Sequence, residues 1–211
     1  MKNRLSKIKW FTLLSAIFPT FWLIYQTWRG AFAPFPTLFI TQYAGRFAVY
    51  FLLLSLASTP IRKIFSLTAF IYPRKIWGLA SFYYAILHAF TFIGVDYQFN
   101  LQWLVPEFRD KPYLLLGLAA LLFLLVMAVT SIKNIQKRIK SLWIRLHKGI
   151  YLFGLLILIH QYLAIKGDKR DALILIVIYS ILMLLRIPTF QKIVTIRKKE
   201  KLTKFDQWLK A

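Results

Sequence analysis

The feature that most restricts the fold of this chain is a series of apolar segments long enough to cross a membrane. A transmembrane helix needs about 20 mostly apolar residues. Six segments approach that length: residues 10–28, 47–60, 76–95, 113–131, 149–165 and 172–188. The second is short, so we expect it to extend back through Tyr43 and Arg46 and to end at Pro60, a helix breaker. The sequence therefore predicts an all-α polytopic membrane bundle with six transmembrane helices.

The polar ends of the chain set the predicted domain limits. We expect an N-terminal tail at 1–9, the six-helix transmembrane domain at 10–190 and a basic C-terminal tail at 191–211. The first apolar segment is long and aromatic and lacks a small-x-small cleavage site, so it is interpreted as a span rather than a signal peptide. No repeat of 20–50 residues is visible. One compact bundle is the expected organisation.

The net charge of +22 in a chain that is 59% hydrophobic indicates orientation in a membrane. With the N-terminus inside, 22 of the 29 Lys and Arg residues fall on the inner side and seven on the outer side, whereas five of the seven acidic residues fall outside. This asymmetry follows the positive-inside rule. It predicts that both termini are cytoplasmic, that the basic tail contacts anionic lipid, and that the charge does not serve to bind nucleic acid.

The chain has no cysteine, which excludes thiolate zinc sites, iron–sulfur clusters and covalently attached c-type haem. Its three histidines, His88, His147 and His160, lie in or at the edge of predicted spans. Ionisable residues inside a membrane are costly and mark functional sites. A single membrane histidine is nevertheless often only a hydrogen-bonded packing residue, so the argument depends on how the three are arranged.

Two of the histidines lie at the same predicted depth. His88 and His160 each follow the inner start of their span, near Ile76 and Lys148, by 12 residues, which is about 18 Å along a helix. Two imidazoles at one depth on neighbouring helices can ligate one haem iron from opposite faces. Without thioether links such a haem is b-type. The sequence therefore predicts a haem b in the outer half of the membrane.

The third histidine suits a second, inner haem less well. His147 lies 13 residues before His160, about 20 Å nearer the inner face but roughly 140° away around an ideal helix. The matching depth of the third span holds Arg74 and no histidine. Because a guanidinium stays protonated and is a poor metal ligand, we expect Arg74 to contact a haem propionate.

Two further arginines are candidates for propionate contacts. Arg46 starts the second span on the outer side, and Arg145 lies next to His147 on the inner side. Arginine binds carboxylates well through its planar fork of donors. Alternatively, Arg46 anchors the helix at the membrane interface, and Arg145 only follows the positive-inside placement of charge.

Several short motifs occur in a characteristic order and spacing over roughly residues 10–190. They are Gly45-Arg46, Thr59-Pro60, Arg74-(x)3-Gly78-Leu79, Leu87-His88, Lys111-Pro112-Tyr113-Leu114-(x)2-Gly117, Thr130-Ser131, Trp143-(x)2-Leu146-His147, Tyr151-Leu152 and His160. Together they resemble the MsrQ (YedZ) family, the haem-binding membrane subunits of periplasmic methionine sulfoxide reductase systems. Lys111 stands where arginine is common in that family.

The resemblance implies a member of the ferric-reductase-like transmembrane superfamily with one or two b-type haems on His88, His147 and His160. It implies an electron-transfer subunit of the bacterial inner membrane that has no substrate-reducing site of its own. Such a subunit takes electrons from membrane quinone and passes them to a periplasmic molybdopterin-containing MsrP-type reductase, which repairs oxidised methionine in envelope proteins. The family is also linked to FMN, although no feature of this sequence places that cofactor.

Two other functions remain open at this point. One is a stand-alone ferric or other metal reductase fed by a soluble flavin reductase, and the other is a non-redox transporter or structural membrane subunit. The chain ends soon after the sixth segment, so we expect no cytosolic flavin domain. Electrons would then come from a membrane carrier or from a separate flavoprotein.

Overall fold

The computed structural model describes residues 2–65 and 71–187, and this part of the chain contains helices and connecting turns but no β-strand. The all-α prediction is therefore confirmed for these residues. The helices, in chain order, are α1 (Lys2–Trp28), α2 (Pro36–Phe65), α3 (Ile71–Phe90), the π-helix η2 (Thr91–Asp96), α4 (Leu101–Asp110), α5 (Tyr113–Thr130), α6 (Lys133–Lys148), α7 (Ile150–Ala164) and α8 (Arg170–Leu184).

Five stretches of the described chain are long and apolar enough to cross a membrane. They lie in α1, in α2, in α3 with η2, in α5, and in α6 with α7. α8 overlaps the sixth predicted segment as far as Leu184 but has 15 residues, fewer than a span needs. Residues from 188 onward lie outside the described part, and with them the predicted tail at 191–211. The sixth span and the domain limits therefore stay predictions.

The second helix differs from its prediction at one end. α2 begins at Pro36, so the expected extension beyond Arg46 is confirmed. The sequence predicts that this helix ends at Pro60, and this prediction is wrong. The helix continues through the proline to Phe65. A proline inside a helix removes the hydrogen bond to the carbonyl four residues earlier, which here is Leu56. The oxygen of Leu56 instead accepts a hydrogen bond of 2.5 Å from Nη2 of Arg186.

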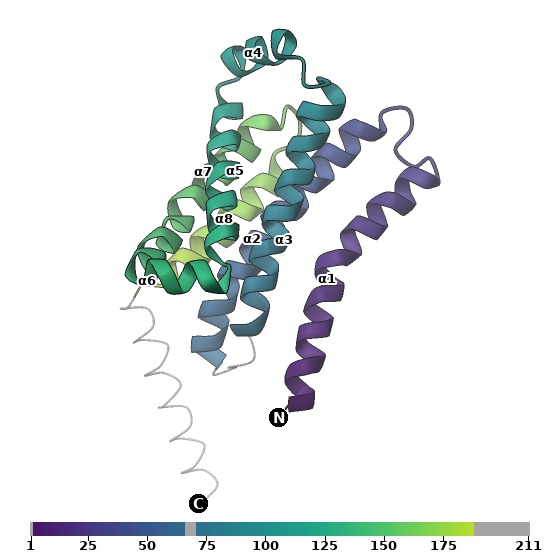
Figure 1. Cartoon of the computed structure of the whole chain (residues 1–211). Helices are drawn as coiled ribbons and strands as arrows, with labels where there is room; N and C mark the ends of the chain where they lie inside the picture. The colour runs from purple at the N-terminus through teal and green to yellow at the C-terminus, as the bar shows by residue number, and fades with distance from the viewer. Residues whose placement is uncertain (1, 66–70, 188–211) are drawn as a thin grey trace, which may run out of the picture.

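Figure 1 shows α2, α3, α5, α7 and α8 gathered in one bundle, with α1 along one side. The short helix α4 lies across one end of the bundle, and α6 lies across the other. α1 begins, and α2 and α8 end, at the end that carries α6. We call the two ends the α4 end and the α6 end. The charge distribution predicts that the α6 end faces the cytoplasm.

The predicted spans leave residues 132–148 as a connecting loop, but the structure has the helix α6 there. α6 carries many lysines and arginines, and its path bends at Lys140, where the backbone φ is 39°. Its apolar side chains Leu142 and Ile144 are exposed, as in basic amphipathic helices that lie in a membrane interface. Nε1 of Trp143 donates a hydrogen bond of 3.1 Å to the carbonyl of Thr130, which fastens α6 to the end of α5.

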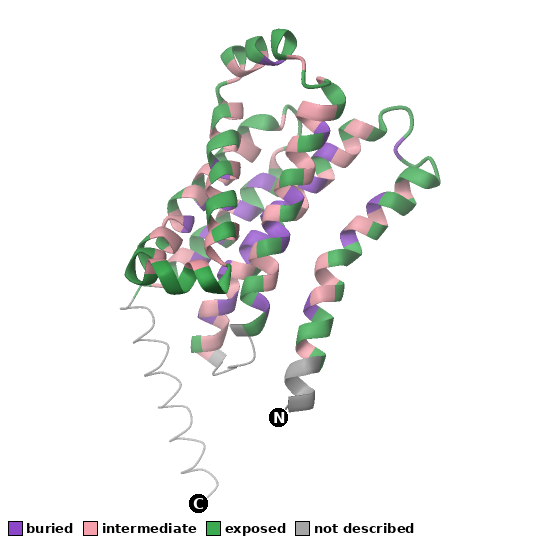
Figure 2. Ribbon diagram, in the orientation of Figure 1, coloured by how far each residue is buried: buried purple, intermediate pink, exposed green. Residues whose placement is uncertain are grey.

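The core lies where α2, α5, α7 and α8 face one another, and Figure 2 shows buried residues on these facing sides. Leu52, Leu124, Leu158 and Leu175 belong to it, and Leu158 is 1% exposed. The outward surfaces carry many exposed large apolar side chains. In water such a surface would promote aggregation, whereas in a bilayer it contacts lipid chains that are equally apolar.

α1 is joined to the bundle mainly through Tyr84 of α3, whose side chain is fully buried. The Tyr84 hydroxyl donates to the carbonyl of Ala16 at 2.9 Å and lies 2.9 Å from the hydroxyl of Thr20. Trp22 of α1 packs edge to face against Tyr43 of α2, with ring centroids 5.0 Å apart. These contacts hold α1 against the outer side of the α2–α3 pair.

Candidate functional site

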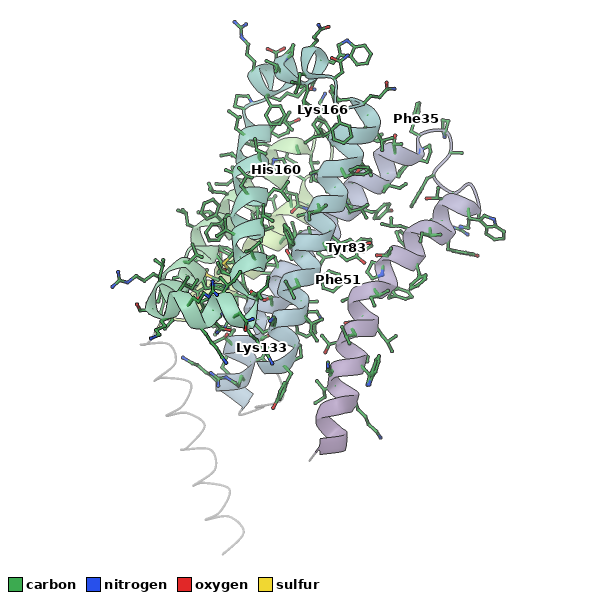
Figure 3. The ribbon with its side chains drawn as sticks, in the orientation of Figure 1. Phe35, Phe51, Tyr83, Lys133, His160 and Lys166 are labelled. Carbon is green, nitrogen blue, oxygen red and sulfur yellow. The ribbon has the colours of Figure 1, made fainter. Side chains whose placement is uncertain are left out.

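A cavity of about 290 Å³ lies among α2, α3, α5 and α7. Most of its lining is apolar, including Val49, Leu121 and Ile157, and Phe108 from α4 also lines it. His88 and His160 line the same cavity. Figure 3 shows His160 in the part of the bundle nearer to Lys166, at the α4 end, than to Lys133 at the α6 end.

The two histidine rings face each other across this cavity. Their centroids are 6.2 Å apart, and their planes meet at 81°. Nδ1 of His88 lies 2.8 Å from the carbonyl oxygen of Thr41, and Nδ1 of His160 lies 2.7 Å from that of Tyr113. Because a carbonyl oxygen can only accept a hydrogen bond, each Nδ1 carries the proton. Each Nε2 therefore keeps a lone pair available for a metal.

This arrangement fits two imidazoles on opposite sides of one metal ion. Two metal–nitrogen bonds of about 2 Å each, plus the radii of the two rings, put the ring centroids about 6 Å apart, close to the distance found. Metal-bound histidines also commonly donate their other ring N–H to a carbonyl. The described residues contain no group of three or more His, Cys, Asp or Glu side chains that could hold a metal ion. The two histidines fit a metal ion that carries further ligands of its own, as the iron of a haem does.

The helix that carries His88 changes its hydrogen-bonding pattern just beyond this residue. The π-helix η2 begins at Thr91, and π-helical turns are frequent at functional sites. The Thr91 hydroxyl donates to the carbonyl of His88 at 3.0 Å, and the Thr41 hydroxyl donates to Thr91 at 2.7 Å. Thr41 thus contacts the His88 ring through its carbonyl and the adjoining turn through its hydroxyl, which holds ring and backbone together.

Four polar side chains besides the histidines line the cavity, namely those of Gln42, Arg46, Ser81 and Gln161. Arg46 lines it while lying 3.9 Å from the carboxylate of Asp171 and 5.7 Å from the ring centroid of Tyr43. Gln161 also lines it, and its Oε1 atom is buried without a hydrogen-bond partner among the described residues. A buried amide without a partner is costly. Arg46 and the amide of Gln161 therefore suit a ligand that carries its own hydrogen-bonding groups.

The helix that contributes Phe108 is held in place at both of its ends. Asn100 caps the start of α4 by accepting a hydrogen bond of 2.9 Å from the backbone N–H of Gln102. Beyond the other end, Lys111 donates to the carboxylate of Glu107. This hydrogen bond lowers the pKa of Glu107 and raises the pKa of Lys111. These two contacts hold α4 in place, so that its Phe108 side chain closes part of the cavity.

The other predicted site residues lie away from this cavity. His147, in α6, stacks on Trp143 at 4.1 Å between ring centroids, and its Nδ1 lies 3.1 Å from the Trp143 carbonyl. Arg74 is an electrostatic neighbour of both His147 and Arg186. Arg145 is exposed on α6. The structure thus brings His88 and His160 together with Arg46, and leaves His147, Arg74 and Arg145 near the α6 end.

Sequence reasoning missed several residues that shape the cavity. Thr41 and Tyr113 act through backbone carbonyls, which residue type does not reveal. Gly45 and Gly117 lie against the two imidazole rings, and Gln161 adds an amide. One signal was available, because each glycine precedes its histidine by the same 43 residues. The two glycine–histidine pairs are 72 residues apart, which is longer than the repeats of 20–50 residues considered above.

Comparison with known proteins finds one family that matches more than half of the chain. Residues 44–158 match the family described as the ferric reductase like transmembrane component. This range covers more than half of the chain and contains His88 and His147, with His160 just beyond its end.

Individual relatives extend the match. A protein-methionine-sulfoxide reductase heme-binding subunit MsrQ from Xanthomonas oryzae pv. oryzae is 32% identical over 163 residues, covering 77% of this chain and 75% of the relative. The subunit of the same name from Rhodospirillum rubrum is 31% identical over 187 residues, covering 88% and 89%. Magnetosome protein MamZ from Magnetospirillum gryphiswaldense is 31% identical over 174 residues, which are 78% of this chain but 27% of MamZ.

Proposed function

Because this chain belongs to the MsrQ family of ferric reductase-like transmembrane proteins, we propose that it is a haem-binding electron-transfer subunit of the bacterial inner membrane. The observation that carries this proposal is the pair His88 and His160, whose rings face each other at 6.2 Å across an apolar cavity. Their hydrogen bonds to carbonyl oxygens leave both Nε2 atoms free to bind iron.

In this proposal each part of the cavity has a definite task. A b-type haem, when bound, supplies a carrier that accepts and releases one electron at a time. Nε2 of His88 and Nε2 of His160 hold its iron, while the carbonyls of Thr41 and Tyr113 keep the rings oriented and raise their basicity. Arg46 donates hydrogen bonds to a haem propionate. The apolar walls limit water, which helps to set the reduction potential.

The proposed direction of electron flow is outward across the membrane. We propose that membrane quinol supplies the electrons and that a periplasmic MsrP-type methionine sulfoxide reductase receives them. The relatives' printed name, heme-binding subunit of a protein-methionine-sulfoxide reductase, supports this assignment. So does the position of His160, with His88 next to it, toward the α4 end, because the charge distribution assigns this end to the periplasm. No described residue supports a position for FMN.

The α6 end is the proposed place for a second haem, with His147 as ligand and Arg74 and Arg145 toward its propionates. The electrostatic proximity of Arg74 to His147 supports this arrangement. The cavity between His88 and His160 does not extend to these residues. The two positions are therefore independent, and removal of His147 leaves the first haem in place.

Reduction by a quinol tests the proposed electron source. Duroquinol, added to the purified protein in detergent without any soluble reductase, is expected to produce the α-band of reduced haem b. Dithionite serves as the positive control because it reduces any accessible haem. If duroquinol leaves the haem oxidised while a soluble flavin reductase with NADH reduces it, the result would support the other function considered above, a stand-alone metal reductase fed by a flavin reductase. A colourless purified protein would indicate a transporter or structural subunit instead.

The proposed orientation can be tested with single cysteines, because the natural chain has none. Gly167 lies in the turn between α7 and α8 with open space around it, and Lys137 is exposed on α6. In intact spheroplasts, Gly167→Cys is expected to react with a membrane-impermeant maleimide, whereas Lys137→Cys reacts only after the membrane is permeabilised. The reverse labelling pattern would overturn the placement of the α6 end in the cytoplasm.

A further inference from the structure

The haem cavity is built from two equivalent halves of the chain. A shift of 72 residues carries Thr41, Gly45 and His88 onto Tyr113, Gly117 and His160. In each half the ring nitrogen and its carbonyl partner are 47 residues apart in sequence. The same shift matches identical residues on the helices that carry the glycines: Ala48 with Ala120, Phe51 with Phe123, and Leu52 with Leu124. The pair α2–α3 thus corresponds to the pair α5–α7.

In both halves a glycine lies against the histidine ring. A Cβ atom added to Gly45 would lie 3.1 Å from Nδ1 of His88, and one added to Gly117 would lie 2.6 Å from Cε1 and 2.9 Å from Nδ1 of His160. The second set of distances is shorter than any van der Waals contact allows. Both glycines lie inside helices, where alanine is normally favoured over glycine. Local backbone preference therefore does not account for glycine at either position.

We propose that Gly45 and Gly117 are positioning residues of the haem site, each allowing the imidazole of the partner helix to lie directly on its own helix backbone. In that position the ring nitrogen reaches the carbonyl four residues before the glycine, Thr41 in one half and Tyr113 in the other. The glycines thereby fix the planes of both rings at 81° to each other. This inference rests on the proposed function, in which both histidines bind the iron.

The orientation of the rings matters for the electronic state of the iron. The plane of an axial imidazole determines which iron d orbitals it overlaps, so the angle between two such planes determines the anisotropy of the ferric low-spin signal. The hydrogen bond at Nδ1 sets the basicity of the ligand and hence the reduction potential. A methyl group at Gly117 must displace the His160 ring and lengthen its 2.7 Å hydrogen bond to Tyr113. A methyl group at Gly45 displaces His88 less.

The test compares four alanine variants in the full-length protein. Gly117→Ala and Gly45→Ala place a methyl group against a ligand ring. Gly154→Ala is the matched steric control, because its Cβ would lie 3.1 Å from the Tyr179 ring and touches neither histidine. Gly78→Ala is the control for an uncrowded helical glycine, since its nearest atom is Oγ of Ser55 at 3.4 Å. The measurements are the ferric electron paramagnetic resonance spectrum, the midpoint potential and the amount of haem retained.

We expect Gly117→Ala to convert the low-spin ferric signal largely to high spin, with about 10–100-fold weaker haem binding, as is typical when an outer-shell partner is disturbed. Gly45→Ala is expected to stay low-spin with a shifted largest g value and a shifted midpoint potential. Gly154→Ala and Gly78→Ala keep the wild-type g values. Unchanged g values and potentials in Gly45→Ala and Gly117→Ala, or an equal change in Gly154→Ala, would overturn the inference.

A second background keeps the test decisive if Gly117→Ala does not fold. In a His160→Ala protein the ring that the new methyl group would strike is absent, so adding His160→Ala is expected to restore the folding yield of the Gly117→Ala protein. If the double variant is as poorly folded as Gly117→Ala alone, the glycine serves general packing and the inference fails. A purified wild-type protein without haem would contradict the proposed function itself, whereas haem retained in both His88→Ala and His160→Ala would contradict only the ligand assignment. The two failures are therefore distinguishable.

Discussion

Replacement of either His88 or His160 by alanine is expected to abolish haem b absorption at the outer site. In the proposed site each ring would hold the iron through its Nε2 atom, and the ring centroids are 6.2 Å apart, close to the separation that two bonds to one metal ion need. Loss of an axial ligand should exceed the about 10–100-fold loss of affinity typical for outer-shell partners. The measurement is the Soret and α-band absorbance of the purified variants, oxidised and dithionite-reduced, per mole of protein.

His147→Ala is the matched control for these variants, because it removes the remaining histidine without touching the cavity. We expect it to keep the outer haem and its low-spin spectrum. If the protein binds a second haem through His147, the haem content of this variant falls by about half, which also reports the haem count. Full haem content in both His88→Ala and His160→Ala would show that the ligand assignment is wrong.

The second large effect is expected at Arg186, which joins three helices. Its guanidinium donates hydrogen bonds of 2.5 Å to the hydroxyl of Tyr151 and to the carbonyl of Leu56. That carbonyl has no helical donor, because Pro60 stands four residues later and lacks an N–H. Replacement by leucine leaves both acceptors without this donor, at about 1–3 kcal/mol for each buried polar group. We expect Arg186→Leu to lower the free energy of unfolding by about 2–4 kcal/mol.

This prediction can be checked by denaturant or thermal unfolding in detergent, followed by circular dichroism. Arg186→Lys keeps the positive charge but lacks the planar fork that reaches two acceptors at once, so its stability should be intermediate. Arg138→Leu, at an exposed position of α6, controls for loss of charge and should change stability by less than about 0.5 kcal/mol. Equal stability of Arg186→Leu and Arg138→Leu would contradict the structural role of Arg186.

The sequence predicted the helical class of the fold and the two histidines of the cavity from different kinds of signal. Apolar segment length is a local property, and each of the six predicted segments coincides with a helix over most of its described residues. The matched depth of His88 and His160 follows from counting residues along two spans, because the rise per residue of a helix is constant. Amphipathic helices were harder to foresee. α4 and α6 occupy the stretches between predicted spans, and α6 carries many lysines and arginines, so neither was predicted as a helix.

The number of apolar segments can therefore be read directly from the sequence, which also gives an expected orientation of the chain and an expected depth of its histidines. They depend on hydropathy, on the distribution of charge and on the rise per residue of a helix, and each of these can be counted residue by residue along the chain. The packing of the helices, with their rotation about their own axes, is seen only in the folded structure. It turns His88 and His160 toward each other, places the backbones of Gly45 and Gly117 behind their rings, and brings Arg186 to the carbonyl that Pro60 leaves without a donor. Such contacts join residues far apart in sequence, and they exist only once neighbouring helices have packed.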